Sequence, residues 1–233
     1  MTKLNLKPKD FLVILTGAGI SAESGIKTFR DSDGLWENHS VEEVATPEGF
    51  ANNPILVWKF YKERYYQALS VSPNPGHIAL VDLEKKLNKN FLLVTQNVDG
   101  LHDRAGSKSV IEMHGSLNTC FCTNCKKKEL MSDVDLNPDI PICSACGKML
   151  RPDIVWFGEM PYRMNEIYKA LDKATVFMTI GTSGNVYPAA NFIAYVRNRG
   201  ARTIGVNLEK PENMAYIDEF FQGKAGDILP SIL

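Results

Sequence analysis

The sequence lacks any apolar run that approaches the roughly 20 residues needed to cross a bilayer. It also lacks an excess of one charge sign: its formal net charge is −1, which gives no general affinity for nucleic acid or anionic membranes. Its first residues, MTKLNLKPKD, lack the apolar core of a signal peptide. We therefore expect a cytoplasmic protein with no membrane partner and no nucleic-acid partner.

Cysteine is absent from most of the chain. The 5 cysteines all lie between Cys120 and Cys146. A secreted protein held together by disulfides would carry them along its whole length, and a reducing compartment disfavours disulfides. Clustered cysteines in a cytosolic chain indicate metal ligands first.

Two Cys-x-x-Cys pairs, Cys122 with Cys125 and Cys143 with Cys146, have the spacing of a tetrahedral four-cysteine zinc site. A loop-rich segment this short cannot hold itself by burial, so a metal would supply its folding energy. Four thiolates leave zinc no open position, so we expect one structural zinc ion. Coincidental clustering is the alternative, disfavoured by the scarcity of cysteine. Cys120 is too close in sequence to Cys122 to complete a pair and is expected to be a free thiol.

Four apolar runs of strand length alternate with helical stretches. They are FLVILTG at 11–17, FLLVTQN at 91–97, ATVFMTIG at 174–181 and ARTIGVNLE at 201–209. This alternation predicts an α/β fold, a Rossmann-like parallel sheet with helices on both faces. Because ligands bind at the carboxyl ends of such strands, we expect the site there.

Two segments interrupt the alternation. Residues 33–75 look helical, with Pro54 near a helix start, and residues 115–153 are rich in cysteine and turns. We expect these insertions to form a smaller lobe within one catalytic domain, 1–233. The larger, Rossmann-like lobe would comprise approximately 1–32, 76–114 and 154–233.

A glycine-rich segment, Gly17-Ala18-Gly19-Ile20-Ser21-Ala22, follows the first predicted strand and fits a loose G-x-G-x-x-[G/A] pattern. Alone, this pattern is weak evidence for a cofactor loop, since a tight turn that binds no ligand could have the same sequence. Gly181 and Asn207 end other strands on the same edge, which strengthens it. A dehydrogenase would also need a carboxylate about twenty residues later. Here that distance falls in the loop-like DGLWEN, so we do not expect a simple dehydrogenase.

Polar side chains gather at the end of another strand. Gln96, Asn97 and Asp99 follow FLLV, and His114 precedes the cysteine segment. A lone histidine is more often a packed or solvated residue than a catalyst. Because hydrogen-bonding groups converge on the same edge, His114 becomes a candidate general base.

Taken together, these motifs resemble those of the sirtuins, the NAD-dependent protein lysine deacylases. GAGISAESGIKTFR is similar to the family's cofactor loop, TQNVDGLH to its nicotinamide pocket and HGS to its catalytic-histidine motif. The cysteine pairs, GTSGNVYPA and NLE follow in the family's order. The resemblance covers nearly the whole chain and is closest to the class III branch, associated with desuccinylation and demalonylation, including its bacterial members.

The resemblance implies residue roles, with NAD as a consumed co-substrate. His114 and Asn97 would be catalytic. The implied cofactor-binding residues are Gly17, Ala18, Gly19, Glu23, Thr28, Phe29, Arg30, Trp36, Gln96, Asn97, Asp99, Gly181, Thr182, Ser183, Asn207, Leu208, Glu209 and Ala225. The implied substrate-binding residues are Ala22, Tyr61, Arg64, Val155, Phe157, Gly158, Glu159, Val186 and Tyr187. VWFGE, from Val155 to Glu159, looks like the family's substrate-binding strand, which would bind an acyl-lysine peptide by strand addition.

The implied chemistry is acyl transfer. The amide oxygen of the acyl-lysine would attack the nicotinamide ribose and expel nicotinamide, and His114 would then act as general base on a ribose hydroxyl. The products would be free lysine, nicotinamide and O-acyl-ADP-ribose. The expected partners are acylated lysine side chains of cytoplasmic proteins, bound by a monomer.

Tyr61 and Arg64 are three residues apart in an apolar helical stretch, so they would share one face. In class III sirtuins a Y-x-x-R pair binds the distal carboxylate of a succinyl or malonyl group, and this pair is similar. Arginine offers a planar fork for a carboxylate, and a phenol adds a neutral donor. The small Ala22 leaves room for the acyl group, and acetyl-lysine should also enter. The alternative is a surface arginine whose head stays in water.

Three other functions compete with deacylation. An NAD-dependent protein ADP-ribosyltransferase would use the same cofactor site, but His114 and the acyl-lysine channel argue against it. A non-enzymatic zinc module that binds nucleic acid or silencing partners is disfavoured by the missing basic excess, although CKKK at 125–128 is locally basic. A dehydrogenase fails on the absent ribose carboxylate.

Overall fold

The structure, a computed structural model, describes residues 3–27, 35–36 and 39–233, with the backbone alone at 35–36. Its centre is a 6-stranded parallel sheet in the order β11-β10-β9-β1-β4-β5. Numbered along the chain, this is the doubly wound order 3-2-1-4-5-6, which confirms the predicted fold class. The strands are β1 (Leu12–Thr16), β4 (Phe91–Thr95), β5 (Val110–Glu112), β9 (Val176–Ile180), β10 (Arg202–Asn207) and β11 (Glu219–Gln222).

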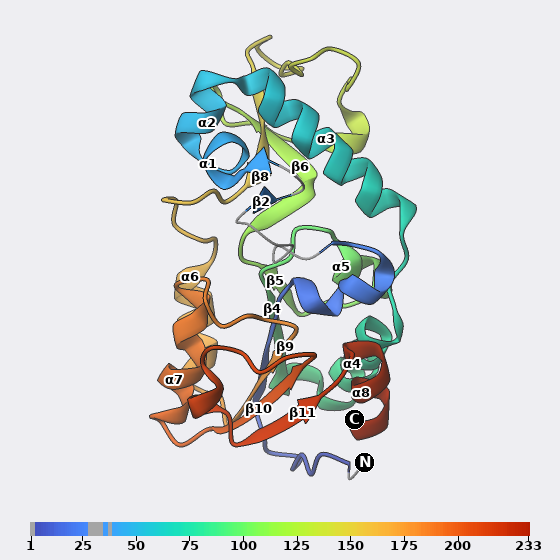
Figure 1. Ribbon diagram of the computed structural model, residues 1–233, viewed down its shortest axis with the longest axis vertical. Helices are drawn as coiled ribbons and strands as arrows, with labels where there is room; N and C mark the ends of the chain where they lie inside the picture. Colours follow the sequence, from blue (N-terminus) through green and yellow to red (C-terminus); the bar gives the residue numbers. More distant parts are fainter. Residues whose placement is uncertain (1–2, 28–34, 37–38) are drawn as a thin grey trace.

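Helices cover both faces of this sheet (Figure 1). α4 (Pro75–Leu87), α5 (Leu101–Ala105) and α8 (Ala225–Ile232) lie on one side, and α6 (Met164–Leu171) and α7 (Phe192–Arg197) lie on the other. Each side has its own buried apolar cluster. All of β1 is therefore buried, which explains its continuous apolar sequence.

The four strands expected from apolar runs are present as β1, β4, β9 and β10. The two edge strands, β5 and β11, were not predicted. Both are short, and the residues of β11 are only partly buried or exposed, so neither carries a continuous apolar run. Edge strands are commonly short and polar because an exposed apolar edge would invite aggregation.

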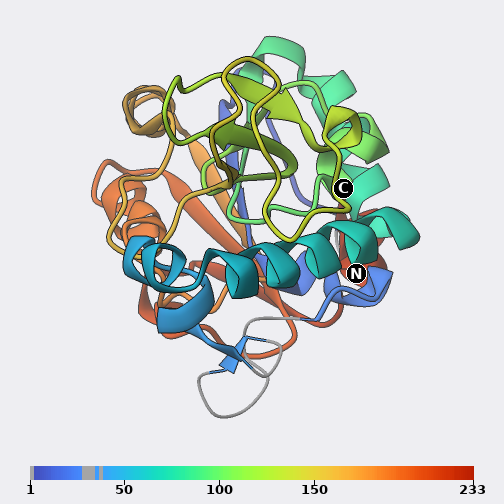
Figure 2. The same ribbon diagram turned by 90° about the horizontal axis from the view of Figure 1, so that it is seen from above.

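The helical insertion begins with a short hairpin, β2 (Leu35–Trp36) and β3 (His39–Ser40), which was not predicted. Three helices follow it, α1 (Val41–Val44), α2 (Pro47–Asn52) and α3 (Pro54–Ser70). The expected helix start at Pro54 is confirmed, and Asn53 caps it by accepting a 3.1 Å hydrogen bond from the amide of Leu56. Figure 2, a view from above, shows α3 crossing the molecule from one side to the other.

The cysteine-rich segment forms an antiparallel sheet in the order β7-β6-β8. Its strands are β6 (Gly115–Cys122), β7 (Lys128–Leu130) and β8 (Leu150–Ile154). It shares one buried cluster with α1–α3, and the indole Nε1 of Trp58 donates a 2.9 Å hydrogen bond to the carbonyl of Leu150. The two insertions therefore pack on each other above the parallel sheet (Figure 1).

Six short 3-10 turns complete the described chain: η1 (Ala18–Ile20), η2 (Ala22–Ser24), η3 (Asn88–Asn90), η4 (Met131–Asp133), η5 (Ala189–Asn191) and η6 (Met214–Tyr216). Within the described ranges, no helix has the length and apolarity that a membrane crossing requires.

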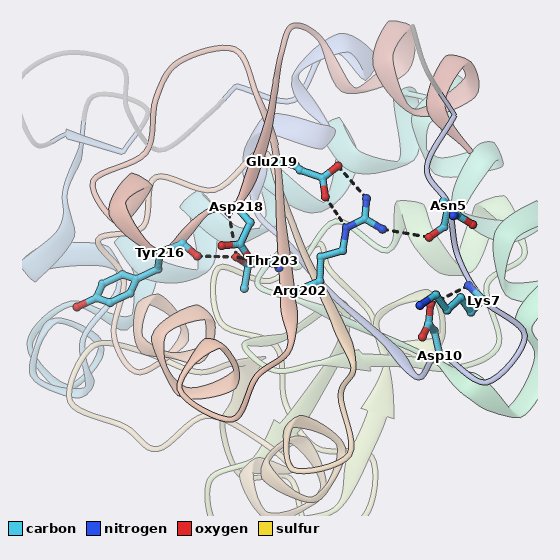
Figure 3. A network of polar contacts seen from close by, with 8 residues as sticks. All are labelled: Asn5, Lys7, Asp10, Arg202, Thr203, Tyr216, Asp218 and Glu219. Atoms are coloured by element: carbon cyan, nitrogen blue, oxygen red, sulfur yellow. Dashed lines mark hydrogen bonds and ion pairs between the residues drawn. The ribbon is translucent and has the colours of Figure 1, made fainter.

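A polar network ties β11 and the N-terminal segment to the start of β10 (Figure 3). The guanidinium of Arg202 binds both carboxylate oxygens of Glu219 and donates a 3.0 Å bond to the carbonyl of Asn5. The next residue, Thr203, is held by the carboxylate of Asp218 at 2.9 Å and 2.8 Å. These contacts lie at the amino-terminal ends of β10 and β11, opposite the carboxyl ends at which ligands bind in such sheets.

Candidate active site

A cavity of about 740 Å³ lies where β1, β4, β9 and β10 end, beneath α3 and the turn after β8. Its size is typical of small-molecule sites, roughly 300–1,000 Å³. It sits at the reversal of strand order between β1 and β9, where doubly wound folds bind ligands. Every predicted cofactor and substrate residue whose side chain is described lines it, except Glu23. Four predicted cofactor residues cannot be placed in this way, because they lie outside the described residues or, for Trp36, have no described side chain: Thr28, Phe29, Arg30 and Trp36.

The glycines after β1 are required by the loop after β9. The amide of Gly19 donates a 2.9 Å bond to the carbonyl of Gly181, and a Cβ at Gly19 would lie 2.6 Å from the Gly181 Cα. A Cβ at Gly17 would lie 2.8 Å from the Gly181 oxygen. The segment forms η1 and η2 instead of an α-helix, so it does not present an α-helix N-terminus to the cavity. The backbone predicted to contact the cofactor pyrophosphate therefore belongs to a loop, and this loop packs against the loop that follows β9.

Asn97 is held at the cavity wall by its neighbours. Its backbone N–H donates to Thr95 Oγ1 at 3.0 Å, and its side-chain Nδ2 donates to Ser21 Oγ at 3.1 Å. Asp99, two residues on, accepts a 2.9 Å bond from the amide of Leu101, and burial raises its pKa. Both predicted polar residues thus have fixed orientations.

His114 presents one defined nitrogen to the cavity. Its Nδ1 lies 3.1 Å from the carbonyl oxygen of Gln96, and because a carbonyl only accepts, Nδ1 carries the proton. The lone pair is therefore on Nε2. Burial lowers the pKa of His114, and the hydrogen bond to Gln96 partly opposes this. The ring is neutral at pH 7, which is the form that a general base needs.

Glu23 does not line the cavity. Its Oε2 accepts a 2.7 Å bond from the amide of Gly226 in the first turn of α8, where a carboxylate is favourable. The adjacent Ala225 does line the cavity. Glu23 thus supports the wall at the end where Asn207 donates from Nδ2 to the carbonyl of Thr182 at 3.0 Å.

Tyr61 and Arg64 face the cavity together, as their spacing predicted. The phenol oxygen of Tyr61, which is 1% exposed, accepts a 2.9 Å bond from Trp156 Nε1, and burial raises its pKa. The Arg64 side chain is 15% exposed, and its Nη2 lies 3.7 Å from the carboxylate of Glu63. Its Nε and Nη1 are buried and find no hydrogen-bond partner among the described residues. A buried unpaired donor costs about 1–3 kcal/mol.

The predicted substrate-binding strand at 155–159 was wrong as a strand. β8 ends at Ile154, and the following residues form a turn. The amides of Val155 and Phe157 donate to the carbonyls of His114 and Ala45 at 2.9 Å and 3.0 Å. Because these amides bond within the chain, an added peptide strand cannot use them as donors.

Several cavity residues were not predicted. Gln67 continues the Tyr61 and Arg64 face by one more step of three residues, so the spacing could have identified it. Trp156 lies inside the VWFGE motif, but an alternating strand would have turned it away from Val155 and Phe157. The full set is Ile26, Lys27, Ala45, Gln67, Val98, Leu117, Ile154, Trp156, Pro161, Val206 and Gly223.

The four predicted zinc ligands come together. The sulfur atoms of Cys122, Cys125, Cys143 and Cys146 all lie within 4.8 Å of one another, with close pairs at 3.4 Å, 3.7 Å and 3.7 Å. Zinc–sulfur bonds of about 2.3 Å in a tetrahedron place sulfurs about 3.8 Å apart, so the group fits zinc. Cys120 is buried outside this group, and burial raises its pKa to about 12.

Comparisons with known proteins agree with this geometry. The Sir2 family model matches residues 17–188. The chain is 55% identical over 225 residues to an "NAD-dependent protein deacylase" of Bdellovibrio bacteriovorus, covering 95% of this chain and 94% of that protein. It superposes on a Sir2 homologue mutant–ADP ribose complex with a TM-score of 0.88 at 41% identity, over 94% of this chain and 89% of that one.

A structure titled "Sir2-p53 peptide-NAD+" is similar as well, with a TM-score of 0.85, 32% identity and coverage of 95% and 91%. The family match spans the glycine loop, His114 and all four zinc-site cysteines. The chain belongs to the Sir2 family.

Proposed function

We propose that this protein removes acyl groups from lysine side chains and prefers those that end in a carboxylate, such as succinyl and malonyl groups. The coarser activity stands on the comparisons: the protein is an NAD-dependent protein deacylase. The observation that carries the preference is that Nε and Nη1 of Arg64 are buried and have no hydrogen-bond partner in the described part of the chain. Arg64 lies beside Tyr61 in the same cavity as His114.

A carboxylate matches the surroundings of Arg64. It supplies acceptors for the guanidinium, a charge opposite to it, and a plane that fits its fork. Tyr61 adds a second group of suitable chemistry, because its raised pKa keeps the phenol neutral. An acetyl group would supply no acceptor to Nε and Nη1 of Arg64 but would fit sterically, so we expect weaker deacetylation.

NAD fits the other end of the cavity. Small residues of the loops after β1 and β9, among them Ala18 and Gly181, line this end of the cavity, and Asn97 and Asp99 line the same cavity as His114. When bound, NAD supplies an electrophilic ribose carbon with nicotinamide as leaving group. Nε2 of His114 would accept the proton of a ribose hydroxyl.

Acylated lysine peptides are the expected partners, as the p53 peptide is for a structural neighbour. We also place the protein in the cytoplasm and expect a monomer. Support for the compartment comes from the four-cysteine group and the free Cys120, since such thiols persist in reducing surroundings.

The test compares wild type with Arg64→Met on succinyl-, malonyl- and acetyl-lysine versions of one peptide, with NAD, by mass spectrometry. Loss of one partner of a buried charge pair costs roughly 2–5 kcal/mol, so kcat/KM for the acidic acyl groups should fall at least about tenfold. Deacetylation should persist. Arg199→Met is the matched control, because Arg199 pairs with Asp172 at the surface.

Equal rates on all three peptides in wild type, unchanged in Arg64→Met, would contradict the acidic preference. The protein would then be a general deacetylase. Radiolabel from NAD that becomes fixed on the protein substrate would instead favour ADP-ribosyl transfer.

A further inference from the structure

The turn after β8 contains a residue that borders the acyl end of the cavity without belonging to the Tyr61 and Arg64 pair. Trp156 is 2% exposed and lines the cavity, and its Nε1 lies 2.9 Å from the phenol oxygen of Tyr61. An indole N–H can only donate, so the phenol oxygen must be the acceptor of this bond. The phenol proton is therefore directed away from Trp156, which restricts where Tyr61 can donate.

The indole is itself held tightly. The guanidinium of Arg151 lies 3.6 Å from the centre of its ring, and the Phe50 ring packs 5.3 Å away. Arg151 binds both carboxylate oxygens of Glu159 at 2.8 Å and the carbonyl of Ile154 at 2.9 Å. The amide of Trp156 donates to the same Glu159 carboxylate at 2.9 Å. The indole cannot swing away from Tyr61 without disturbing this charge-assisted network.

The phenol and the guanidinium are coupled through a third ring. Phe60 packs edge-on against Tyr61 at 5.2 Å, and the Arg64 guanidinium lies over the same ring at 4.9 Å. A shift of Tyr61 would thus move the surface on which Arg64 rests. Because cores are close-packed, displacements of this kind pass directly between neighbours.

We propose that Trp156 is a positioning residue for acyl selectivity: its indole N–H fixes the Tyr61 phenol in the orientation that receives the distal carboxylate of the acyl group. The turn at 155–159 would then both border the acyl-lysine and set the geometry of its acyl pocket. This inference rests on the proposed preference for acidic acyl groups.

The test is a double-mutant cycle on the ratio of kcat/KM for succinyl-lysine to that for acetyl-lysine in one peptide. Trp156→Phe keeps an aromatic ring but removes the N–H, and should lower this ratio about three- to tenfold, the effect of one neutral hydrogen bond. Tyr61→Phe should lower it about tenfold or more. In the Tyr61→Phe background, adding Trp156→Phe should not change the succinyl-to-acetyl ratio further, because the two residues act through the hydrogen bond between them.

Trp58→Phe is the matched control. It removes another buried indole N–H, bonded to the Leu150 carbonyl from the same helix as Tyr61, yet Trp58 does not line the cavity. Its ratio should stay at the wild-type value. Arg151→Lys keeps the charge but loses the two-point contact with Glu159 and the stacking on Trp156, so it should also lower the ratio. This variant replaces Trp156→Phe in the test if Trp156→Phe does not fold.

An unchanged ratio in Trp156→Phe and Arg151→Lys would overturn the inference. So would an equal fall in Trp58→Phe, or independent, multiplicative losses in the Tyr61 cycle. Arg64→Met, measured alongside, identifies failure of the proposed function. If that variant leaves the ratio at the wild-type value, the acidic preference itself is wrong and the role of Trp156 falls with it.

Discussion

At the scale of single residues, burial shifts the pKa values of the titratable groups that line the cavity and so keeps His114 and Tyr61 neutral. His114 keeps its proton on Nδ1, facing the Gln96 carbonyl, and burial lowers its pKa. A lower pKa keeps Nε2 available as a base at lower pH. Tyr61 responds in the opposite direction, because burial raises its pKa and leaves it a neutral hydrogen-bonding group.

The activity should therefore persist to lower pH than a histidine with an unshifted pKa would allow. The base limb of kcat/KM against pH should have its midpoint below 6.5, the ordinary pKa of histidine, because the deprotonated form is the active one. His114→Gln, which lacks a titratable base at this position, should abolish the activity. A midpoint above 6.5 would contradict the assignment of His114 or of its environment.

Gly19→Ala should disturb both the fold and the cofactor site. The new Cβ would lie 2.6 Å from the Gly181 Cα, which is backbone that cannot rotate away. We expect a loss of about 1–3 kcal/mol in unfolding free energy, typical of overpacking, and weaker NAD binding. Urea unfolding and calorimetry measure the two effects, and an unchanged stability would show that the loops separate easily.

Residues with strong chemical constraints were the ones that could be predicted from sequence. The sirtuin resemblance singled out His114, Tyr61 and Arg64, the shared spacing placed the last two on one helix face, and all three line the same cavity. Trp156 was missed because it reaches the cavity from a turn, whereas the expected strand would have pointed its side chain away from those of Val155 and Phe157. Glu23 was predicted as a cofactor contact, yet its partner Gly226 lies far away in the chain and local pattern gives no sign of it.

At the scale of elements, the antiparallel sheet β7-β6-β8 depends on its cysteine group. The apolar residues of this segment join the cluster under α3, so the metal site and the acyl end of the cavity share one core. The spacing of the cysteines predicted the site, but not the sheet around it. The reason is that its strands are stabilised by the metal and by α3 and carry few long apolar runs.

Zinc removal should therefore unfold this element and disturb the acyl pocket. Cys122→Ser should lower the zinc content below one equivalent, reduce thermal stability and abolish deacylation. Cys120→Ala is the control, because Cys120 is buried but stands apart from the four-cysteine group. Colorimetric zinc analysis and thermal melts distinguish the two, and full zinc content in Cys122→Ser would contradict the ligand set.

At the scale of the whole molecule, a buried histidine pair lies between α4 and α5 on one side of the parallel sheet. The rings of His77 and His102 lie 4.9 Å apart, and His102 Nε2 lies 2.9 Å from Thr16 Oγ1 in β1. Burial lowers the pKa of His77 to about 4 and that of His102 to about 3. Both are neutral in the folded protein and join α4 and α5 to the sheet.

Stability should therefore decline below about pH 6.5. There the unfolded chain binds protons that the folded protein refuses until about pH 4 or lower, so each histidine lowers the unfolding free energy by up to about 1.4 kcal/mol per pH unit. Glu112 opposes this between about pH 7 and 4.5, because burial raises its pKa to about 7. Comparing how the unfolding free energy falls with pH in two proteins isolates the contribution of the histidines. In urea unfolding, His102→Gln should show a shallower decline below about pH 6.5 than wild type does. Equal slopes would contradict the lowered pKa of His102.

The most direct test of the account is a competition assay on the wild-type protein. One peptide, carrying either succinyl-lysine or acetyl-lysine, is supplied as an equal mixture with NAD, and the initial rates of the two losses are followed by mass spectrometry. Their ratio is the ratio of kcat/KM values, free of differences in enzyme quality. The two buried guanidinium nitrogens of Arg64 that have no partner among the described residues, Nε and Nη1, predict that the succinyl peptide is consumed faster, by about tenfold or more. A ratio at or below one would contradict the carboxylate-binding role of Tyr61 and Arg64.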